Sequence, residues 1–249
     1  MKALITGASS GIGKEMAIYL SSLGYDLILV SRDSKKLESL KSKLKTNVEI
    51  YSYDLSVTNN CYELYNKIKN KKIDIIINNA GFGAFGGYQI DNLDIEMNMI
   101  DLNIKCVHIM TKLFLNNNNT KYIMNVASSA GLMPGGPLMS GYYATKSYVC
   151  SYSMAIYEEL RRNNSDKSIS ILCPGPVETG FNDRANVKFD LKSLSAEYVA
   201  KYAIDNMFRK KLLIIPGTSV KFGLFFAKLL PKKLILKLTY NIQKKKDSK

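Results

Sequence analysis

Residues 2–13 read KALITGASSGIG, an apolar run followed by a turn with glycines at positions 7, 11 and 13. The apolar run suits a short buried strand, and the periodic segment after it suits a helix. Glycine lets the backbone turn sharply and lets a ligand approach without Cβ clashes. The N-terminus of a helix at this point offers free N–H groups and a positive dipole end to a pyrophosphate. The stretch predicts a dinucleotide-binding strand, turn and helix, with a glycine-rich turn that binds no ligand as the alternative.

Six more apolar runs alternate with helix-length periodic segments, an order typical of a parallel sheet covered by helices. The expected strands are residues 2–6, 26–30, 48–53, 73–78, 121–127, 168–173 and 212–216. The expected helices lie near residues 11–23, 34–44, 59–70, 91–118, 141–163 and 195–210. The strands are almost continuously apolar, which suits burial on both faces. We therefore expect an α/β fold in which residues 1–217 form one doubly wound domain, with a seven-stranded parallel sheet and helices on both faces.

The chain has 249 residues, enough for one large α/β domain with a full core. Its formal net charge is +14, and nine of the lysines but only one acid lie from residue 221 onward. This terminal excess argues against nucleic-acid binding, which needs basic residues on a groove-fitting element inside the fold. Residues 218–249 are predicted to be a basic amphipathic extension, with stretches at 219–230 and 232–243. The extension is expected to cap the domain, join a subunit interface or lie peripherally on an anionic membrane.

The four cysteines and the single histidine, His108, are spread along the chain without a CxxC pair. Zinc sites need clustered cysteine or histidine ligands, so no metal is expected. The chain enters an apolar strand at once, and no apolar run approaches the ~18 residues of a membrane span. The expectations are buried free thiols, a packed or surface histidine and a cytoplasmic location.

Tyr142 and Lys146 stand four residues apart in a predicted helix, which places both on one helical face. The same spacing occurs at residues 65–69 and 240–244, so spacing alone is weak evidence. The first pair differs because Ser128 lies 14 residues upstream of Tyr142, at the end of the fifth strand. In a doubly wound sheet, sites gather at the carboxyl ends of strands, where Ser128 should meet the start of the Tyr142 helix. The neighbouring Ser129 is an alternative to Ser128.

Taken in order, these and further motifs resemble those of the short-chain dehydrogenase/reductase family, from residue 3 to about residue 216. The matching positions are Thr6-Gly7-(x)3-Gly11-Ile12-Gly13, Asp54-Leu55, Asn78-Asn79-Ala80-Gly81, Asn103, Ser128, Tyr142-(x)3-Lys146 and Pro174-Gly175-Pro176-Val177-(x)-Thr179. The resemblance implies a Rossmann-type fold and an oxidoreductase that transfers a hydride between nicotinamide and a ketone or secondary alcohol. It also implies a small-molecule substrate and a homodimer or homotetramer. The alternative is a catalytically idle dinucleotide-binding sensor or scaffold.

By that resemblance, the catalytic residues are Asn103, Ser128, Tyr142 and Lys146. Tyr142 is the expected general acid and base, Ser128 polarises the substrate carbonyl, and Asn103 supports a water-linked proton path. Lys146 holds the nicotinamide ribose. With the charge of the oxidised nicotinamide, it is also expected to lower the pKa of Tyr142 from about 10 towards about 7. Residues 178–194 correspond to the family's substrate lid, and their apolar content favours an apolar pocket.

The same resemblance implies a set of cofactor-binding residues, most of them just after the expected strands and two on the Tyr142 helix. They are Gly7, Ser9, Ser10, Gly11, Ile12, Gly13, Ser31, Arg32, Asp54, Leu55, Asn79, Ala80, Gly81, Tyr142, Lys146, Pro174, Gly175, Val177 and Thr179. Ser31 and Arg32 follow the second strand, where a dinucleotide fold reads the adenosine ribose. An arginine there neutralises a 2′-phosphate, so NADP(H) is favoured over NAD(H). The alternatives are that Arg32 is a solvated loop charge, that Asp33 caps the next helix, and that Asp54, expected at the adenine, only forms a turn.

Overall fold

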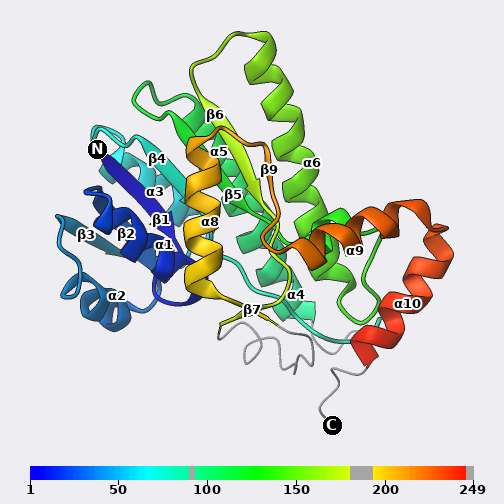
Figure 1. Cartoon of the computed structure of the whole chain (residues 1–249). Helices are drawn as coiled ribbons and strands as arrows, with labels where there is room; N and C mark the ends of the chain where they lie inside the picture. The colour runs from blue at the N-terminus through cyan, green and yellow to red at the C-terminus, as the bar shows by residue number, and fades with distance from the viewer. Residues whose placement is uncertain (90–92, 180–192, 245–249) are drawn as a thin grey trace.

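The computed structural model describes residues 1–89, 93–179 and 193–244. Within them, seven parallel strands form a sheet in the order β3-β2-β1-β4-β5-β6-β9 (Figure 1). The strands are β1 (Lys2–Thr6), β2 (Asp26–Ser31), β3 (Val48–Ser52), β4 (Ile75–Asn78), β5 (Tyr122–Val126), β6 (Ser168–Leu172) and β9 (Leu213–Ile214). The predicted doubly wound, seven-stranded parallel sheet is confirmed. Its last strand is shorter than expected and pairs with β6 at two positions.

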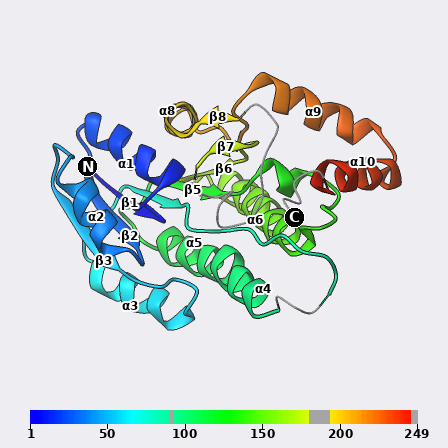
Figure 2. The same cartoon turned by 90° about the horizontal axis from the view of Figure 1, so that it is seen from below.

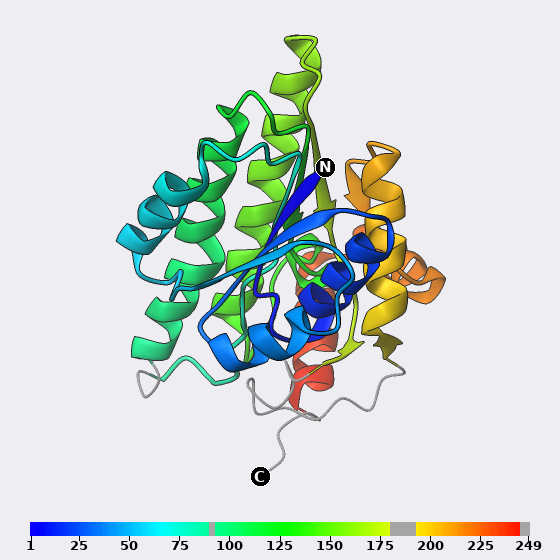
Figure 3. The ribbon, with the colours of Figure 1, turned by 90° about the vertical axis from the view of Figure 1, so that its left-hand side faces the viewer.

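Helices cover both faces of the sheet, with the blue and gold helices on one side and the cyan and green helices on the other (Figure 3). One face carries α1 (Gly11–Ser22), α2 (Ser34–Lys41) and α8 (Ala196–Phe208), and the other carries α3 (Thr58–Ile68), α5 (Val107–Leu115) and α6 (Ser140–Arg162). Strand β2 shows why the strands are continuously apolar. Leu27 and Leu29 pack under the first group of helices, whereas Ile28 and Val30 pack under the second.

The segment predicted to be helical near residues 91–118 is helical over residues 93–115, but a π-helix that was not predicted interrupts it. The structure has α4 (Leu93–Ile100), a π-helix (Asp101–Cys106) and α5 (Val107–Leu115). Residues 91 and 92 lie outside the described part of the chain. A π turn adds a residue to the helical repeat while the segment stays helical, so the apolar pattern of the sequence does not reveal it. Here the wider turn holds Asn103, whose side chain is fully buried.

The strand order reverses beside β1, which pairs with β2 on one side and with β4 on the other. The loops that follow β1 and β4 therefore separate and open a crevice at the carboxyl edge of the sheet. Thr6 joins the two loops, because its hydroxyl accepts hydrogen bonds from the N–H groups of Asn79 and Ala80, each at 3.0 Å. The Asn79 amide donates in return to the Thr6 and Gly7 carbonyls at 3.0 and 3.1 Å. These bonds fix the glycine turn against the loop after β4.

The chain beyond β6 adds a short strand pair and two helices. The parallel pair of β7 (Val177–Glu178) and β8 (Leu194–Ser195) was not predicted. Most of the predicted lid, residues 180–192, lies outside the described residues. The predicted extension forms α9 (Thr218–Leu229) and α10 (Lys232–Lys244), at the end of the molecule opposite β3 and α2 (Figures 1 and 2). Among the described helices, none combines the length and apolar character needed to cross a membrane.

Candidate active site

A cleft of about 950 Å³ opens at the carboxyl edge of the sheet, where the crevice between β1 and β4 predicts a site. The loops that follow the strands line it, together with the first turns of α6 and the end of α10. It brings together the predicted residues Gly7, Ser9, Ser10, Gly11, Ile12, Ser31, Arg32, Asp54, Leu55, Asn79, Ala80, Gly81, Ser128, Tyr142, Lys146, Pro174, Gly175, Val177 and Thr179. Two predicted residues, Gly13 and Asn103, lie outside this lining.

The glycine turn has the geometry of an anion site. Gly7 and Gly11 have φ angles of +66° and +54°, in the left-handed region that favours glycine. A Cβ at Gly13 would collide with the Gly7 carbonyl, so Gly13 serves the close approach of α1 to the turn. In the part of the chain that the structure describes, the Ser10 side chain does not cap α1. The first N–H groups of the helix are therefore left for a ligand, and the turn fits a pyrophosphate.

Two serines join the glycine turn to the end of β2. The Ser31 hydroxyl donates to the Ser9 hydroxyl at 2.8 Å and accepts from the Asp33 N–H at 3.0 Å. Asp33 in turn caps α2, because its carboxylate accepts from the Lys36 N–H at 3.0 Å. That hydrogen bond holds the pKa of Asp33 below its ordinary value. The alternative interpretation of Asp33, as the cap of the next helix, is therefore confirmed.

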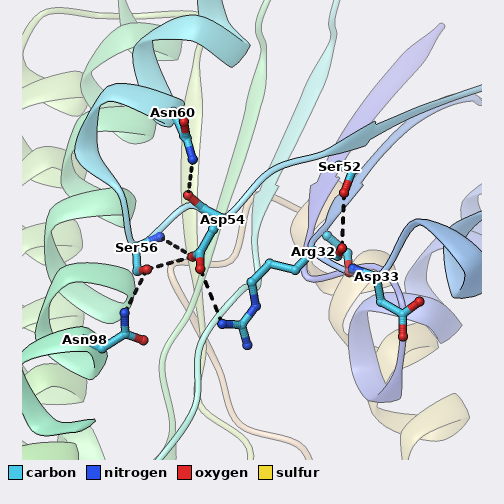
Figure 4. Close-up of polar contacts among 8 residues, drawn as sticks. Arg32, Asp33, Ser52, Asp54, Ser56, Asn60 and Asn98 are labelled. Carbon is cyan, nitrogen blue, oxygen red and sulfur yellow. Dashed lines mark hydrogen bonds and ion pairs between the residues drawn. The ribbon is translucent and has the colours of Figure 1, made fainter. Parts of the chain in front are cut away.

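Arg32 and Asp54 meet at the edge of the cleft, where Arg32 Nη1 lies 3.4 Å from Asp54 Oδ2 (Figure 4). Asp54 also accepts hydrogen bonds from the N–H and the hydroxyl of Ser56 at 3.0 and 2.7 Å. Asn98 donates to the Ser56 hydroxyl at 2.9 Å, and Asn60 donates to the Asp54 carbonyl at 2.8 Å. Burial raises the pKa of Asp54, but the Ser56 bonds and the Arg32 charge outweigh burial and hold the pKa below its ordinary value. Asp54 thus forms the turn before α3, while it also lines the cleft.

Ser128, Tyr142 and Lys146 line the same cleft as Arg32, but Ser128 follows β5 whereas Arg32 follows β2, three strands away in the sheet. Ser128 follows β5, and its hydroxyl forms a hydrogen bond with the Tyr142 phenol. Lys146 lies one turn after Tyr142 on α6, and its Nζ donates to the Val126 carbonyl at 3.0 Å. The same Nζ lies 5.9 Å from the centroid of the Tyr142 ring. The strand-end hydroxyl, the phenol and the ammonium therefore meet as the sequence predicts.

Burial dominates the electrostatics of this group. It raises the pKa of Tyr142 to about 12, against the lowering effect of the Ser128 hydrogen bond. It also lowers the pKa of Lys146 to about 8. In the chain without cofactor, desolvation of the phenolate outweighs the Ser128 hydrogen bond. The lowering of this pKa by Lys146 together with the charge of the oxidised nicotinamide concerns the cofactor-bound chain and stays a prediction. The phenol keeps its proton at neutral pH, which suits a proton donor.

Asn103 does not line the cleft but forms hydrogen bonds to two segments that do. Its amide oxygen accepts a hydrogen bond from the Phe82 N–H at 3.1 Å, and its amide nitrogen donates to the Phe82 carbonyl at 2.8 Å. The same nitrogen donates to the Thr145 hydroxyl at 3.1 Å. Asn103 therefore fastens the loop after β4 to α6, directly beside Lys146.

A residue near the chain end completes the cleft, and the sequence analysis missed it. Gln243 on α10 lines the cleft, and its Nε2 donates to the Tyr143 hydroxyl at 2.8 Å. Its side chain is 2% exposed, and its Oε1 has no hydrogen-bond partner among the described residues. The Tyr143 ring packs on the backbone of Gly136, where a Cβ would collide with it. The amphipathic pattern of residues 232–243 was the available signal, and it does not show which residue of α10 reaches the cleft.

The cysteines and the histidine have packing roles. The four cysteines are buried and free, as predicted. His108 Nδ1 lies 2.7 Å from the Tyr148 hydroxyl, and the His108 ring stacks on Tyr152. Across the described ranges, no cluster of histidine, cysteine, aspartate and glutamate could hold a metal ion. His108 is therefore a packed histidine, one of the two expected environments.

A family model described as short chain dehydrogenase matches residues 1–188. The chain belongs to the short-chain dehydrogenase family. This short-chain dehydrogenase is 36% identical over 183 residues to an uncharacterized short-chain type dehydrogenase/reductase of Sinorhizobium fredii, a match that covers 72% of this chain and 71% of the relative. It is 32% identical over 170 residues to the human very-long-chain 3-oxoacyl-CoA reductase, and this match covers 64% of this chain and 54% of the relative. The chain thus spans about half the length of that human protein.

Other members of the short-chain dehydrogenase family share the fold. Human 17-beta-hydroxysteroid dehydrogenase type 3 is 30% identical over 200 residues, which cover 77% of this chain and 64% of the relative. A solved short-chain dehydrogenase from Sphingobium yanoikuyae in complex with NADPH has a TM-score of 0.79 at 26% identity, and the match covers 92% of this chain and 93% of the other. A member from Burkholderia phymatum in complex with NAD has a TM-score of 0.80 at 24% identity, with 90% and 91% covered. The short-chain dehydrogenase family and the Rossmann-type fold that the motifs imply are therefore confirmed.

Proposed function

We propose that this chain is an NADP(H)-dependent oxidoreductase that transfers a hydride between nicotinamide and a ketone or secondary alcohol, with Tyr142 as general acid and base. The observation that carries the proposal is the meeting of Ser128, Tyr142 and Lys146 in a cleft that also contains the open glycine turn. A dinucleotide-binding scaffold has no need of a buried phenol bonded to a serine beside a buried ammonium. These three residues therefore favour an enzyme over an idle sensor.

The lining of the cleft suits a nicotinamide dinucleotide along its length. We assign Arg32 to the adenosine 2′-phosphate, the glycine turn to the pyrophosphate and Lys146 to the nicotinamide ribose, and all three line the cleft. A Cβ at Gly11 would lie only 3.0 Å from Thr179 Cγ2. The absence of a side chain at Gly11 therefore lets Thr179 pack against the turn. When bound, the dinucleotide supplies or accepts the hydride.

Tyr142 is placed to move the proton that accompanies the hydride. In the reductive direction, its phenol donates this proton to the substrate carbonyl oxygen. The Ser128 hydroxyl is hydrogen-bonded to the phenol, so it is placed to polarise a carbonyl oxygen that binds between the two residues. Lys146 keeps its positive charge below about pH 8 and stabilises the phenolate that remains. Asn103 holds the loop after β4 and α6 in place, and its water-linked proton path stays a prediction.

The environment of Arg32 supports a preference for NADP(H). Its side chain is more than half exposed, and its partner Asp54 accepts two further hydrogen bonds from Ser56. Because an exposed ion pair of this kind contributes little free energy, the guanidinium can turn to a 2′-phosphate at low cost. Asp33, which in an NAD(H) site would accept from the ribose hydroxyls, instead caps α2.

The substrate is proposed to be a largely apolar keto or hydroxy compound with one further hydrogen-bond donor. Phe82, Met139 and Tyr142 form one apolar cluster beside the cleft. The names of two relatives, a very-long-chain 3-oxoacyl-CoA reductase and a hydroxysteroid dehydrogenase, support a bulky apolar substrate. Gln243 Oε1 is a buried acceptor, and a hydroxyl or amide N–H of the substrate would satisfy it.

The homodimer or homotetramer implied by the resemblance stays a prediction. Leu93, Ile95 and Met97 on α4 and Met154 on α6 are large apolar side chains that are exposed in the single chain. These residues support a contact between copies through α4 and α6. Light scattering on the purified chain measures the number of subunits directly.

Turnover tests the proposed function. The purified chain is incubated with NADPH and a panel of bulky apolar ketones, and mass spectrometry identifies the alcohol product. We expect NADPH to be consumed in step with the ketone, and NADH to be used about ten-fold less efficiently or worse. A chain that binds NADPH, as seen by cofactor fluorescence, but reduces no member of the panel would be a sensor, and the proposed function would be excluded.

A further inference from the structure

The C-terminal helices carry an apolar stripe that faces solvent. On α9, Phe222, Phe225, Phe226 and Leu229 follow at three- and four-residue steps, which places them on one side of the helix. We call these four residues the α9 stripe. Their side chains are 65%, 60%, 59% and 67% exposed, whereas Leu224 on the opposite side is buried. Large apolar side chains gathered in this way mark a surface that contacts an apolar partner.

The charge around the α9 stripe has one sign. Residues 218–244 contain six lysines and no acidic residue. Lys221 and Lys228 are seven residues apart, so they lie along one flank of the stripe, and the other four lysines are on α10. A surface of this kind attracts anionic lipid headgroups. It disfavours a second copy of this chain as the partner, because two such faces would bring lysines together.

Helix α10 adds a second exposed apolar row. Leu234, Leu238 and Ile242 recur every four residues and are exposed, whereas Ile235 and Gln243 face the protein. Helices α9 and α10 have 12 and 13 residues. They are too short to cross a bilayer, and helices of this composition lie along its surface. Both helices occupy the end of the molecule away from β3 and α2 (Figures 1 and 2).

We propose that α9 and α10 dock on the surface of a membrane that contains anionic lipid, with the α9 stripe at the boundary between headgroups and acyl chains. The lysines then lie near the lipid phosphates. The buried side of α10 reaches the cleft through Gln243, while the neighbouring Ile242 is exposed. Docking would therefore place the substrate end of the cleft beside the bilayer in which an apolar substrate dissolves. The docking itself requires no turnover, so it goes beyond the proposed function.

Flotation of the full chain with lipid vesicles tests the proposal. We expect the chain to float with vesicles of phosphatidylcholine and phosphatidylglycerol at low salt, and about ten-fold less with phosphatidylcholine alone. The variant Phe225→Ser/Phe226→Ser is expected to float about ten-fold less than wild type on the anionic vesicles. The variant Lys221→Gln/Lys228→Gln is expected to float less and to lose part of its salt dependence.

Two similarly exposed residues at α3 provide the matched control. Val57, the N-cap of α3, and Tyr62 on α3 are 51% and 45% exposed. Helix α3 lies at the other side of the molecule from α9 (Figure 1). The variant Val57→Ser/Tyr62→Ser is expected to float as wild type does, and circular dichroism with thermal unfolding checks that each variant is folded. The proposal is overturned if wild type stays at the bottom with both vesicle types. It is also overturned if the control variant loses flotation as strongly as the phenylalanine variant.

Discussion

The Lys146 ammonium donates a hydrogen bond to the main-chain carbonyl of Val126 at 3.0 Å, which ties the start of α6 to the last residue of β5. Lys146 is 5% exposed, so the bond replaces only part of the hydration that the ammonium loses on folding. The pKa of Lys146 accordingly falls to about 8 through burial. The structure thus holds a cation beside Tyr142 at a cost to the stability of the fold.

Lys146→Met should reveal this cost through its pH dependence. The folded chain loses the Lys146 proton near pH 8 and the unfolded chain near pH 10.5, so between these values the unfolded state binds more protons and wild type gains stability as pH rises. Below pH 8 the buried ammonium lowers the free energy of unfolding of wild type by roughly 3 kcal/mol. The variant carries no ammonium and so does not have this cost. As the pH rises from about 7.5 to about 10.5, wild type should therefore gain about 3 kcal/mol of stability relative to the variant. Urea unfolding of both proteins measures the difference, and a pH-independent difference would contradict the prediction.

The parts of the site that follow strands were predictable from the sequence because local pattern determines them. An apolar run followed by glycines specified the turn after β1, and Ser128 could be placed at the carboxyl end of β5 by its position in the chain. In a parallel sheet, the residues that follow the carboxyl ends of the strands all lie at the same edge. The meeting of Ser128 with Tyr142 follows from that topology.

The features that the sequence did not predict depend on contacts across the fold. The π-helix that holds Asn103 interrupts a helix whose apolar periodicity continues on both sides. Gln243 reaches Tyr143 across 100 positions of sequence, and docking of α10 decides which of its residues faces the cleft. The high pKa of Tyr142 results from burial in the assembled cleft, which outweighs the lowering effect of the Ser128 hydrogen bond. Periodicity and spacing carry none of this information.

Arg32→Ala should separate the two nicotinamide cofactors. The guanidinium is expected to pair with the 2′-phosphate, so its loss should weaken NADPH binding by about ten- to a hundred-fold and leave NADH binding nearly unchanged. Folding should change little, because the Arg32–Asp54 pair is exposed. Lys36→Ala is the control, since Lys36 is an exposed cation on the neighbouring helix. Titration of cofactor fluorescence measures both affinities, and equal losses for NADPH and NADH would argue against the assignment.

Gly81→Ala should disturb the catalytic group through crowding. A Cβ at Gly81 would lie 2.8 Å from Asn103 Oδ1 and 3.3 Å from Lys146 Nζ, so both side chains must shift. We expect a destabilisation of about 1–3 kcal/mol and weaker NADPH binding. Gly223→Ala on α9 is the matched control, because nothing lies within 4 Å of its added Cβ, and a stabilisation of about 0.5–1 kcal/mol is expected. Thermal unfolding compares the two variants, and a Gly81→Ala protein as stable as wild type would refute the predicted crowding.

Gln243→Leu should change substrate selectivity. The variant removes a buried acceptor that has no partner in the described ranges, so ketones with a suitably placed hydroxyl should lose about ten-fold in kcat/KM. Simple apolar ketones of the same size should be reduced as well as before. Tyr143→Phe, which retains the ring packed on Gly136, controls for loss of the Tyr143 hydrogen bond. Steady-state kinetics with matched ketone pairs measures the effect, and an equal loss on both members of a pair would indicate a structural role.

Replacement of the two adjacent tyrosines tests the central claim most directly. Tyr142 and Tyr143 both line the cleft, but Tyr142 is the one bonded to Ser128. In Tyr142→Phe, NADPH affinity should stay within about three-fold of wild type while ketone reduction falls by about a thousand-fold or more, because the proton donor is gone. Tyr143→Phe should retain reduction of simple apolar ketones within about ten-fold. Equal turnover by wild type and Tyr142→Phe, measured as NADPH consumed per alcohol formed, would contradict the account.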